Sequence, residues 1–233
     1  MGDFIEVAEL LVQNGAEVNV QGNWTVPWGG GTPLIWTTER DSYRVAKLLI
    51  NHDANKFQAK NDGTQAIHLA ASFNSLNVLK LLVQNGVTID EPNPHGSTPL
   101  SYASQKDESL DTVKYLVENG AFINSRGQDL NTPLIWASDR NAIHNVKYLI
   151  EHCADIKLTN IRNDTALTIA RKRNFTELVG ILSNTTFIDS LQTNCTKTDG
   201  RVTQPASRFH FDHSLIEFSS YLKTFNLASH FVR

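Results

Sequence analysis

The chain has 233 residues, of which 21 are basic and 24 acidic, and its formal net charge is −3. Such a balance creates no electrostatic field that would attract nucleic acid or an anionic membrane, so neither is expected as a partner. The apolar runs are helix-sized and interrupted by Lys, Glu or Asn, so no segment is predicted to span a bilayer.

Residues 1–19 predict the second helix of a structural unit whose first helix does not precede it. Val7–Val12 has the apolar spacing of an amphipathic helix, and Gly15 suits its end. An unpaired second helix leaves its apolar side bare. Either the chain was cut from a longer protein, or its first residues and a neighbouring chain cover this side. In the second case a chain expected to be monomeric would self-associate through its N-terminal end.

Residues 20–31 are expected to form an extended loop that contains two tryptophans, Trp24 and Trp28, among glycines and a proline. Aromatic side chains are costly to expose to water and are enriched at binding hot spots. Two interpretations stay open. Both side chains fold back over the first unit, or both contact a partner.

Residues 32–184 repeat one pattern. Its opening signal recurs in steps of 33, 33, 34 and 33 residues, beginning at Thr32, Gln65, Thr98, Thr132 and Thr165. Where the signal is Thr-Pro-Leu, the Thr hydroxyl can cap the first turn of a helix, and Pro is tolerated at the first helical position. A second apolar run follows at a spacing of about 3.6 residues, which predicts a second helix that ends at a glycine or its substitute.

This pattern resembles the ankyrin repeat family over residues 7–184. The resemblance implies an all-α solenoid in which each unit has two antiparallel helices, with protruding loops or β-hairpins between units. It also implies a structural, hydrogen-bonding role for His68, which stands where the family's signal reads Thr-Pro-Leu-His. Because each unit would pack only on its neighbours, one elongated core is expected.

After residue 184 the repeat stops. Residues 185–208 are rich in Thr, Asn, Ser, Gln and Asp and are interpreted as a polar linker. Residues 209–233 predict a C-terminal amphipathic helix, because one face would carry Leu215, Phe218, Leu222 and Phe225. That helix would cap the fifth unit, dock on a partner, or continue into a further domain.

No pattern in the sequence indicates an enzyme. The chain has no Gly-rich phosphate loop and no His-Glu-x-x-His motif, and His210 with His213 lacks the further ligands that zinc requires. No catalytic residue, cofactor or metal is therefore expected. The two cysteines, Cys153 and Cys195, argue against a disulfide scaffold and favour a reducing, cytoplasmic setting.

The family's variable surface positions give the candidate partner-binding residues. They fall at the ends of the first helices and at the loop tips, where stacked units would form a concave face. Their charges are of mixed sign, which favours a polar protein segment as the ligand. Trp36 and Trp136 are instead expected to pack between units. With the two loop tryptophans, the candidates are Trp24, Trp28, Glu39, Arg40, Asp62, Phe73, His95, Lys106, Asp129, Asp139, Arg140, Arg162 and Arg173.

The sequence therefore predicts a non-catalytic protein-protein interaction module that binds a partner protein on its concave face and loop tips. The alternative is the recognition portion of a larger enzyme or effector whose catalytic region lies outside this chain. The identity of the partner does not follow from the fold, because one fold serves many functions.

Overall fold

The structure, a computed structural model, describes residues 4–22, 29–192 and 195. The chain divides into two units, Met1–Thr196 and Lys197–Arg233. All of the second unit, with the helix expected at 209–233, lies outside the described residues, and so do Trp24 and Trp28.

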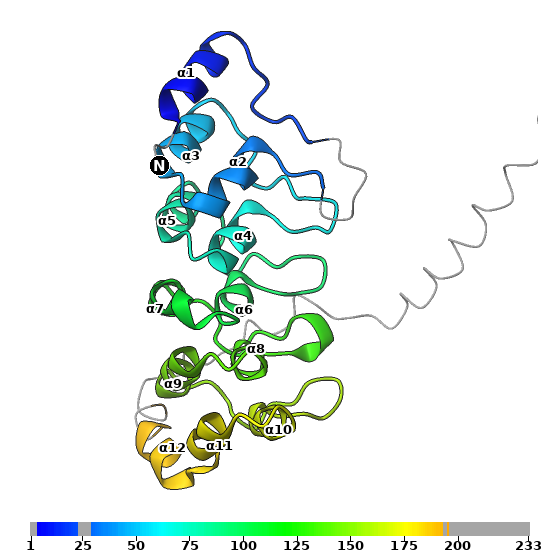
Figure 1. Cartoon of the computed structure of the whole chain (residues 1–233), viewed down its shortest axis with the longest axis vertical. Helices are drawn as coiled ribbons and strands as arrows, with labels where there is room; N and C mark the ends of the chain where they lie inside the picture. Colours follow the sequence, from blue (N-terminus) through cyan, green and yellow to red (C-terminus); the bar gives the residue numbers. More distant parts are fainter. Residues whose placement is uncertain (1–3, 23–28, 193–194, 196–233) are drawn as a thin grey trace, which may run out of the picture. The chain divides into compact units, whose positions relative to one another are not determined.

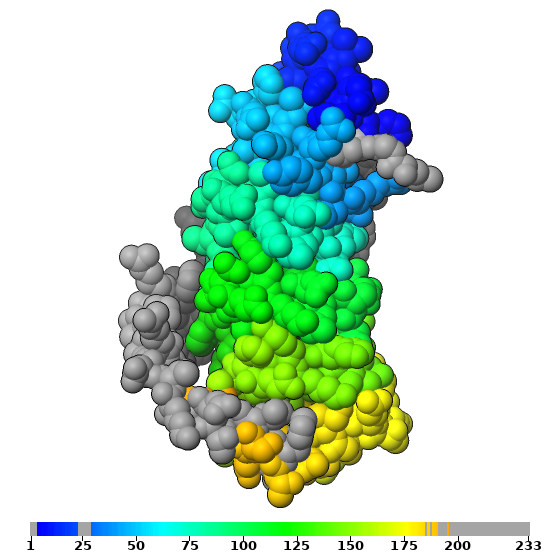
Figure 2. Space-filling model, turned by 90° about the vertical axis from the view of Figure 1, so that its left-hand side faces the viewer, coloured from blue at the N-terminus to red at the C-terminus, as the bar shows by residue number. Residues whose placement is uncertain are grey.

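Every regular element in the described part of the chain is a helix, which confirms the expected all-α solenoid. The connections between repeats are loops, and no β-strand forms among the described residues. In Figure 1 the short first helices form one column, the second helices form another beside it, and the loops project from the first column. Figure 2, which faces the second-helix column, shows the successive repeats as successive bands. None of the described helices combines the length and apolarity needed to cross a bilayer.

Each complete repeat contributes a first helix and a second helix. The first helices are α2 (Pro33–Trp36, continued by the 3₁₀ helix η1, Thr37–Arg40), α4 (Ala66–Ser72), α6 (Pro99–Ala103), α8 (Pro133–Asp139) and α10 (Ala166–Lys172). The second helices are α1 (Ile5–Gln13), α3 (Tyr43–Asn51), α5 (Leu76–Gln84), α7 (Leu110–Glu118, preceded by η2, Asp107–Ser109), α9 (Ile143–Glu151) and α11 (Thr176–Ser183). Two further elements are η3 (Gln128–Leu130) in a loop and α12 (Thr185–Gln192) after the last repeat.

The first helices begin as the Thr-Pro-Leu signal predicts. The hydroxyls of Thr32, Thr132 and Thr165 each accept the backbone N–H three residues further on, at 3.4, 3.2 and 3.2 Å. Pro33 and Pro133 occupy the first helical position, where no N–H is needed. The caps therefore set the start of these helices from local sequence alone.

The second repeat, which has Gln65 in place of Thr, uses His68 to secure the same turn. Nδ1 of His68 accepts the N–H of Gln65 at 3.3 Å, so the proton of the neutral ring is on Nε2, which donates to the carbonyl of Glu91 at 2.8 Å. The ring is fully buried, and this burial lowers the pKa of His68 below its ordinary value. The hydrogen bonds confirm the structural role expected for His68.

The core repeats with the same period as the sequence. Each first helix from α4 to α10 has a fully buried alanine in the same register, which lets neighbouring helices approach closely, and each second helix from α3 to α11 has a buried leucine in the same register. These residues are Ala70, Ala103, Ala137 and Ala170, and Leu49, Leu82, Leu116, Leu149 and Leu182. The result is one continuous core shared by all repeats.

The expectation that Trp36 and Trp136 pack between units is wrong for Trp36. Its side chain is 48% exposed, and its indole N–H donates to the carbonyl of Gly31 at 3.3 Å. Leu34 and Ile35 fill the seam between helices, and the next helical position is turned about 100° away from them. Trp136 is half-buried, and its Nε1 has no hydrogen-bond acceptor among the described residues.

Helix α12 occupies the start of the segment interpreted as a linker, so that interpretation is wrong for residues 185–192. The helix packs against α9 and α11, and Ile188 is buried there. The polar composition of residues 185–208 predicted a linker and gave no weight to the apolar residue Ile188. A short helix can dock on an existing core with little apolar surface of its own, because the core is already formed.

Cys153 and Cys195 form a disulfide, so the interpretation that the two cysteines argue against disulfide bonding is wrong. Cys153 follows α9 with a φ of 74°, the left-handed conformation that Gly86 and Gly120 adopt after α5 and α7 with a φ of 90°. Because α12 packs on α9, the chain returns to the end of α9 and brings Cys195 beside Cys153 across 42 residues. The sequence separation alone gave no sign of this return.

The buried His68 predicts a loss of stability in acid. Its folded-state pKa lies below 6.5, so the unfolded chain binds the proton more readily, and the free energy of unfolding falls as the pH drops below about 6.5. Denaturant unfolding at pH 7.5 and 5.5 measures this slope. We expect His68→Gln to flatten it and the exposed control His52→Gln to leave it unchanged; equal slopes in all three proteins would contradict the role given to His68.

The disulfide predicts that a reductant destabilises the C-terminal end of the stack. A cross-link across 42 residues lowers the conformational entropy of the unfolded chain, which raises the free energy of unfolding by up to about 4 kcal/mol. Reduction should therefore lower the melting temperature. Alkylation followed by mass measurement counts the free thiols before and after reduction. The variant Cys195→Ser should melt at the lower temperature with or without reductant. Two thiols alkylated in the native, unreduced protein would refute the pairing.

Candidate functional site

The candidate site is the surface formed by the first helices and the loop tips, called the inner face below. The tips are the turns at residues 61–63, 94–96, 128–130 and 161–163, which precede the first helices α4, α6, α8 and α10. These loops project from the first-helix column in Figure 1. Side chains from neighbouring repeats therefore meet on one surface.

Phe73 and Lys106, two of the predicted residues, come together from neighbouring repeats. Phe73 ends helix α4 and is 41% exposed. The Nζ atom of Lys106 lies 5.2 Å from the centroid of its ring. A cation over an aromatic face is stabilised by the ring's quadrupole, so the pair presents an apolar ring and a positive charge side by side.

Asp139 joins two predicted cations at the ends of α8 and α10. Its Oδ1 accepts hydrogen bonds from Nε and Nη2 of Arg173 at 3.0 and 2.7 Å. Its Oδ2 lies 3.9 Å from Nε of Arg140. The mixed-sign row predicted along the helix ends is thus partly neutralised within the protein, and one carboxylate is shared by two guanidinium groups.

The other predicted residues lie apart from these pairs. Glu39 and Arg40 are exposed in η1, at the far end of the same row. The Oδ1 of Asp62 accepts the N–H of Thr64 at 2.9 Å, so this carboxylate stabilises its own loop. His95 is exposed at the tip of the following loop.

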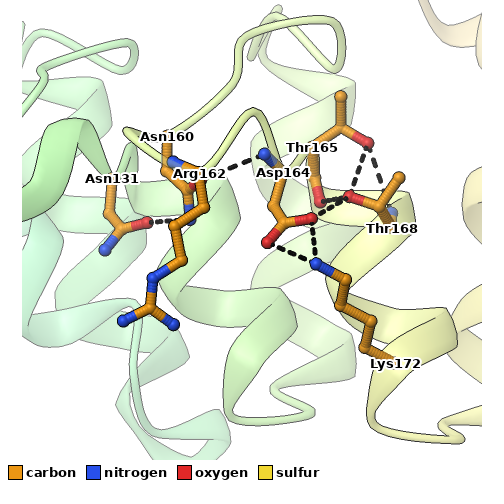
Figure 3. Close-up of polar contacts among 7 residues, drawn as sticks. All are labelled: Asn131, Asn160, Arg162, Asp164, Thr165, Thr168 and Lys172. Atoms are coloured by element: carbon orange, nitrogen blue, oxygen red, sulfur yellow. Dashed lines mark hydrogen bonds and ion pairs between the residues drawn. The ribbon is translucent and has the colours of Figure 1, made fainter.

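The loop before α10 is held by Asn160, which the sequence analysis missed. Its Oδ1 accepts the N–H groups of Arg162 and Asp164 at 2.9 and 3.0 Å, and its Nδ2 donates to Oδ1 of Asn131 at 3.1 Å (Figure 3). An Asn that bonds the backbone two residues further on is a recurrent turn former, and this was the available signal. Asn160 therefore fixes one tip and ties it to the preceding loop.

Asp164 and Lys172 form a second internal pair beside this tip. The Nζ atom of Lys172 lies 2.6 and 2.8 Å from the two carboxylate oxygens, and Thr168 donates its hydroxyl to Oδ1 at 3.2 Å (Figure 3). The hydrogen bond from Lys172 lowers the pKa of the Asp164 carboxyl below its ordinary value. The carboxylate is therefore ionised and paired near neutral pH.

A hollow of about 510 Å³ lies on the inner face between the fourth and fifth repeats. Of the predicted residues, Asp129, Asp139, Arg162 and Arg173 line it, whereas the remaining described ones do not. Its apolar part was not predicted. The lining comprises Asp129, Asn131, Ile135, Trp136, Asp139, Asn160, Arg162, Asp164, Ile169, Lys172 and Arg173.

The chemistry of the hollow suits recognition of a chain that has both polar and apolar groups. Its carboxylates and cations are of mixed sign, so it does not favour a purely anionic or purely cationic ligand. The half-buried Trp136 supplies apolar contact area, whereas Ile135 and Ile169, which also line the hollow, are largely buried. Over residues 4–22, 29–192 and 195, no group of three or more potential metal ligands comes together.

Comparison with known proteins places these features in context. A family model described as ankyrin repeats (3 copies) matches residues 1–93, 54–127 and 88–160. Over 101 residues the chain is 31% identical to "B-cell lymphoma 3 protein homolog" of Mus musculus and, over 101 residues, 26% identical to "Putative palmitoyltransferase ZDHHC13" of Danio rerio. Each alignment covers 43% of this chain, but only 22% and 15% of the two relatives. The chain thus matches about a fifth or less of the length of these relatives.

The Asp164–Lys172 pair predicts a pH-dependent effect of one substitution. In Lys172→Met the pKa of Asp164 should rise, because the hydrogen bond that lowers it is lost. Lys172 is largely exposed, so the free energy of unfolding should fall by less than about 1 kcal/mol at pH 7, and the loss should vanish as the pH falls through the pKa of Asp164. Carboxyl NMR titration and denaturant unfolding measure both effects. Lys157→Met, at another exposed lysine, is the matched control.

Proposed function

The chain belongs to the ankyrin repeat family, whose members are generally protein-interaction modules, and from this premise we propose that its inner face binds a segment of another protein without catalysing a reaction. The observation that carries the proposal is the hollow between the fourth and fifth repeats, where charged and apolar side chains meet. A protein segment offers both kinds of group at once.

The distribution of exposed apolar side chains on the repeats supports the same face. Of the large apolar residues left exposed on the repeats, Trp36, Phe73, Leu130 and Ile161 lie on first helices or loop tips, whereas Tyr43 begins α3 and Phe57 follows that helix. Apolar groups of this kind are costly in water and are typical of contact surfaces. The cation over Phe73 and the shared carboxylate of Asp139 add polar groups with fixed positions, which favour one orientation of a bound segment.

A second candidate is that this region recognises targets for a larger enzyme or effector. The two relatives extend well beyond the part that matches, and the name of one describes a palmitoyltransferase. Sequencing the complete reading frame distinguishes the two candidates. A catalytic region in the same frame would support the second, and start and stop signals that bracket these residues would exclude it.

The N-terminal helix α1 offers a route to self-association. It packs on α3, yet Val7, Leu10 and Leu11 are exposed. A second copy that covered this side would bury apolar surface. Sedimentation over a range of concentrations measures the mass, and a constant monomer mass would exclude this contact.

A cytoplasmic location stays a prediction from the sequence. The Cys153–Cys195 pair argues for a compartment in which disulfides persist, because they are rare in the cytosol. Alkylation of protein taken from the source cells distinguishes a cytoplasmic location from a compartment in which the disulfide persists.

The inner face is tested by substituting Phe73, Lys106 and Arg140 with Ser and measuring partner capture from an extract of the source cells. We expect capture of partners to fall about tenfold or more, since a few central residues supply most of the binding energy of an interface. The matched control carries Gln13→Ser and Gln84→Ser on the exposed side of the second helices. Equal capture by both variants, at equal melting temperatures, would move the binding surface elsewhere.

A further inference from the structure

The loop tip of the fourth repeat differs from the others at one position. Each tip ends in a residue with a positive φ, and in three loops this residue is Gly63, Gly96 or Asn163, at 78°, 75° and 58°. In the fourth repeat it is Leu130, at 59°. Glycine and asparagine adopt this left-handed conformation readily, whereas a leucine is strained there.

A second difference lies three residues earlier. Asn93 and Asn160 each accept two backbone N–H groups of their own tips through Oδ1, but the equivalent position in the fourth repeat is Gly127. Glycine has no side chain to do this, and a Cβ atom at Gly127 would come within 2.6 Å of Oγ of Ser97. The tip at 61–63 lacks such an asparagine as well, because Lys60 occupies this position, but there a glycine, Gly63, takes the positive φ. In the fourth repeat the tip forms a different turn, in which both Asp129 and Leu130 have a positive φ.

Two exposed apolar residues, Leu130 and Ile161, called the ledge below, each adjoin in the chain a residue that lines the hollow, Asp129 or Arg162. Leu130 is 45% exposed and Ile161 is 64% exposed. The two tips are joined, because the N–H of Ile161 donates to the carbonyl of Asp129 at 2.8 Å. The backbone strain of Leu130 and the exposure of its apolar side chain to water each lower the stability of the folded protein. Backbone strain of this kind is concentrated at binding sites.

Two charged side chains flank the ledge, Asp129 and Arg162, at equivalent positions of neighbouring tips. The other charges of the hollow are paired, Asp164 with Lys172 and Asp139 with Arg173. Neither Asp129 nor Arg162 forms an ion pair through its side chain with any residue that the structure describes. In Figure 3 the guanidinium group of Arg162 points away from the Asp164–Lys172 pair. The charge of Arg162 contributes to the lowered pKa of Asp164, but its guanidinium group, like the carboxylate of Asp129, makes no ion pair within the described residues and can pair with a ligand.

The spacing of the repeats sets the spacing of the ligand's charges. Packed helices lie roughly 8–10 Å apart, and the hydrogen bond between Ile161 and Asp129 brings these two tips at least that close. An extended chain advances about 3.3 Å per residue. A bound segment therefore passes from Asp129 to Arg162 within about three residues.

We propose that the ledge and the hollow bind an extended protein segment in which a Lys or Arg and an Asp or Glu stand about three residues apart, with an apolar side chain between them. The cation pairs with Asp129, the carboxylate pairs with Arg162, and the apolar side chain packs on Leu130 and Ile161. This inference rests on the proposed function and specifies its ligand.

Selection from a phage-displayed library of random linear peptides, with the intact chain as target, tests the pattern. We expect enrichment of peptides with opposite charges about three residues apart and an apolar residue between them. Selection on Arg162→Gln should lose the preference for the acidic residue, and selection on Asp129→Asn should lose the preference for the basic one. Enriched peptides without this charge pattern, unchanged preferences in both variants, or no enrichment at all would overturn the inference.

A labelled peptide from the selection then tests the ledge by fluorescence anisotropy. Leu130→Asn copies the residue of the fifth repeat, so the melting temperature should stay the same or rise while the affinity falls about tenfold. A lower melting temperature together with unchanged affinity would contradict a binding role for Leu130.

The outcomes separate this inference from the proposed function. Peptides whose binding is lost in the Phe73, Lys106 and Arg140 variant but is unaffected at Asp129, Leu130 and Arg162 would overturn the inference and leave the proposed function standing. Loss in the tip variants alone would support the inference and restrict binding to the fourth and fifth repeats.

Discussion

Burial of the same few apolar positions in every repeat is the interaction on which the structure depends. A single pair of helices exposes its apolar side and cannot form a core alone, whereas stacked pairs cover one another. Each fully buried leucine of the second helices, such as Leu82 or Leu116, contributes about 1.5–3 kcal/mol relative to an exposed one. Ala70 and Ala103 allow the close approach that this burial requires. Because the seam supplies the stability, the tips and helix ends can hold strained or charged residues.

Polar contacts from each repeat to the next fix how neighbouring repeats sit against one another. The carboxylate of Asp41 accepts Nδ2 of Asn77 at 2.7 Å and the N–H of Val78 at 2.8 Å. Asp107 accepts the N–H of His144 at 2.7 Å in the same manner two repeats later. Contacts of this kind hold neighbouring repeats in register. A surface assembled from several repeats can therefore present groups at defined intervals.

The chemistry of the inner face comes from departures from the repeated pattern. Gly127 stands where Asn93 and Asn160 order the tips before α6 and α10, and the same tip holds an exposed leucine, Leu130, in a left-handed conformation. Phe73 replaces a polar residue and is partly covered by Lys106. Such departures distinguish one repeat from another along an otherwise regular stack.

The sequence by itself determined the helical repeats, their period and the helix starts at Thr32, Thr132 and Thr165, because caps and apolar spacing act within a few residues. It also indicated four charged residues of the hollow, since their positions follow from the period. Only the tertiary structure decided that Asp139 is shared by Arg140 and Arg173, that α12 docks on α9, and that Cys153 meets Cys195. Most of these contacts join residues about one repeat or more apart in the chain. They depend on how neighbouring repeats are rotated and how far side chains reach, which local spacing does not specify.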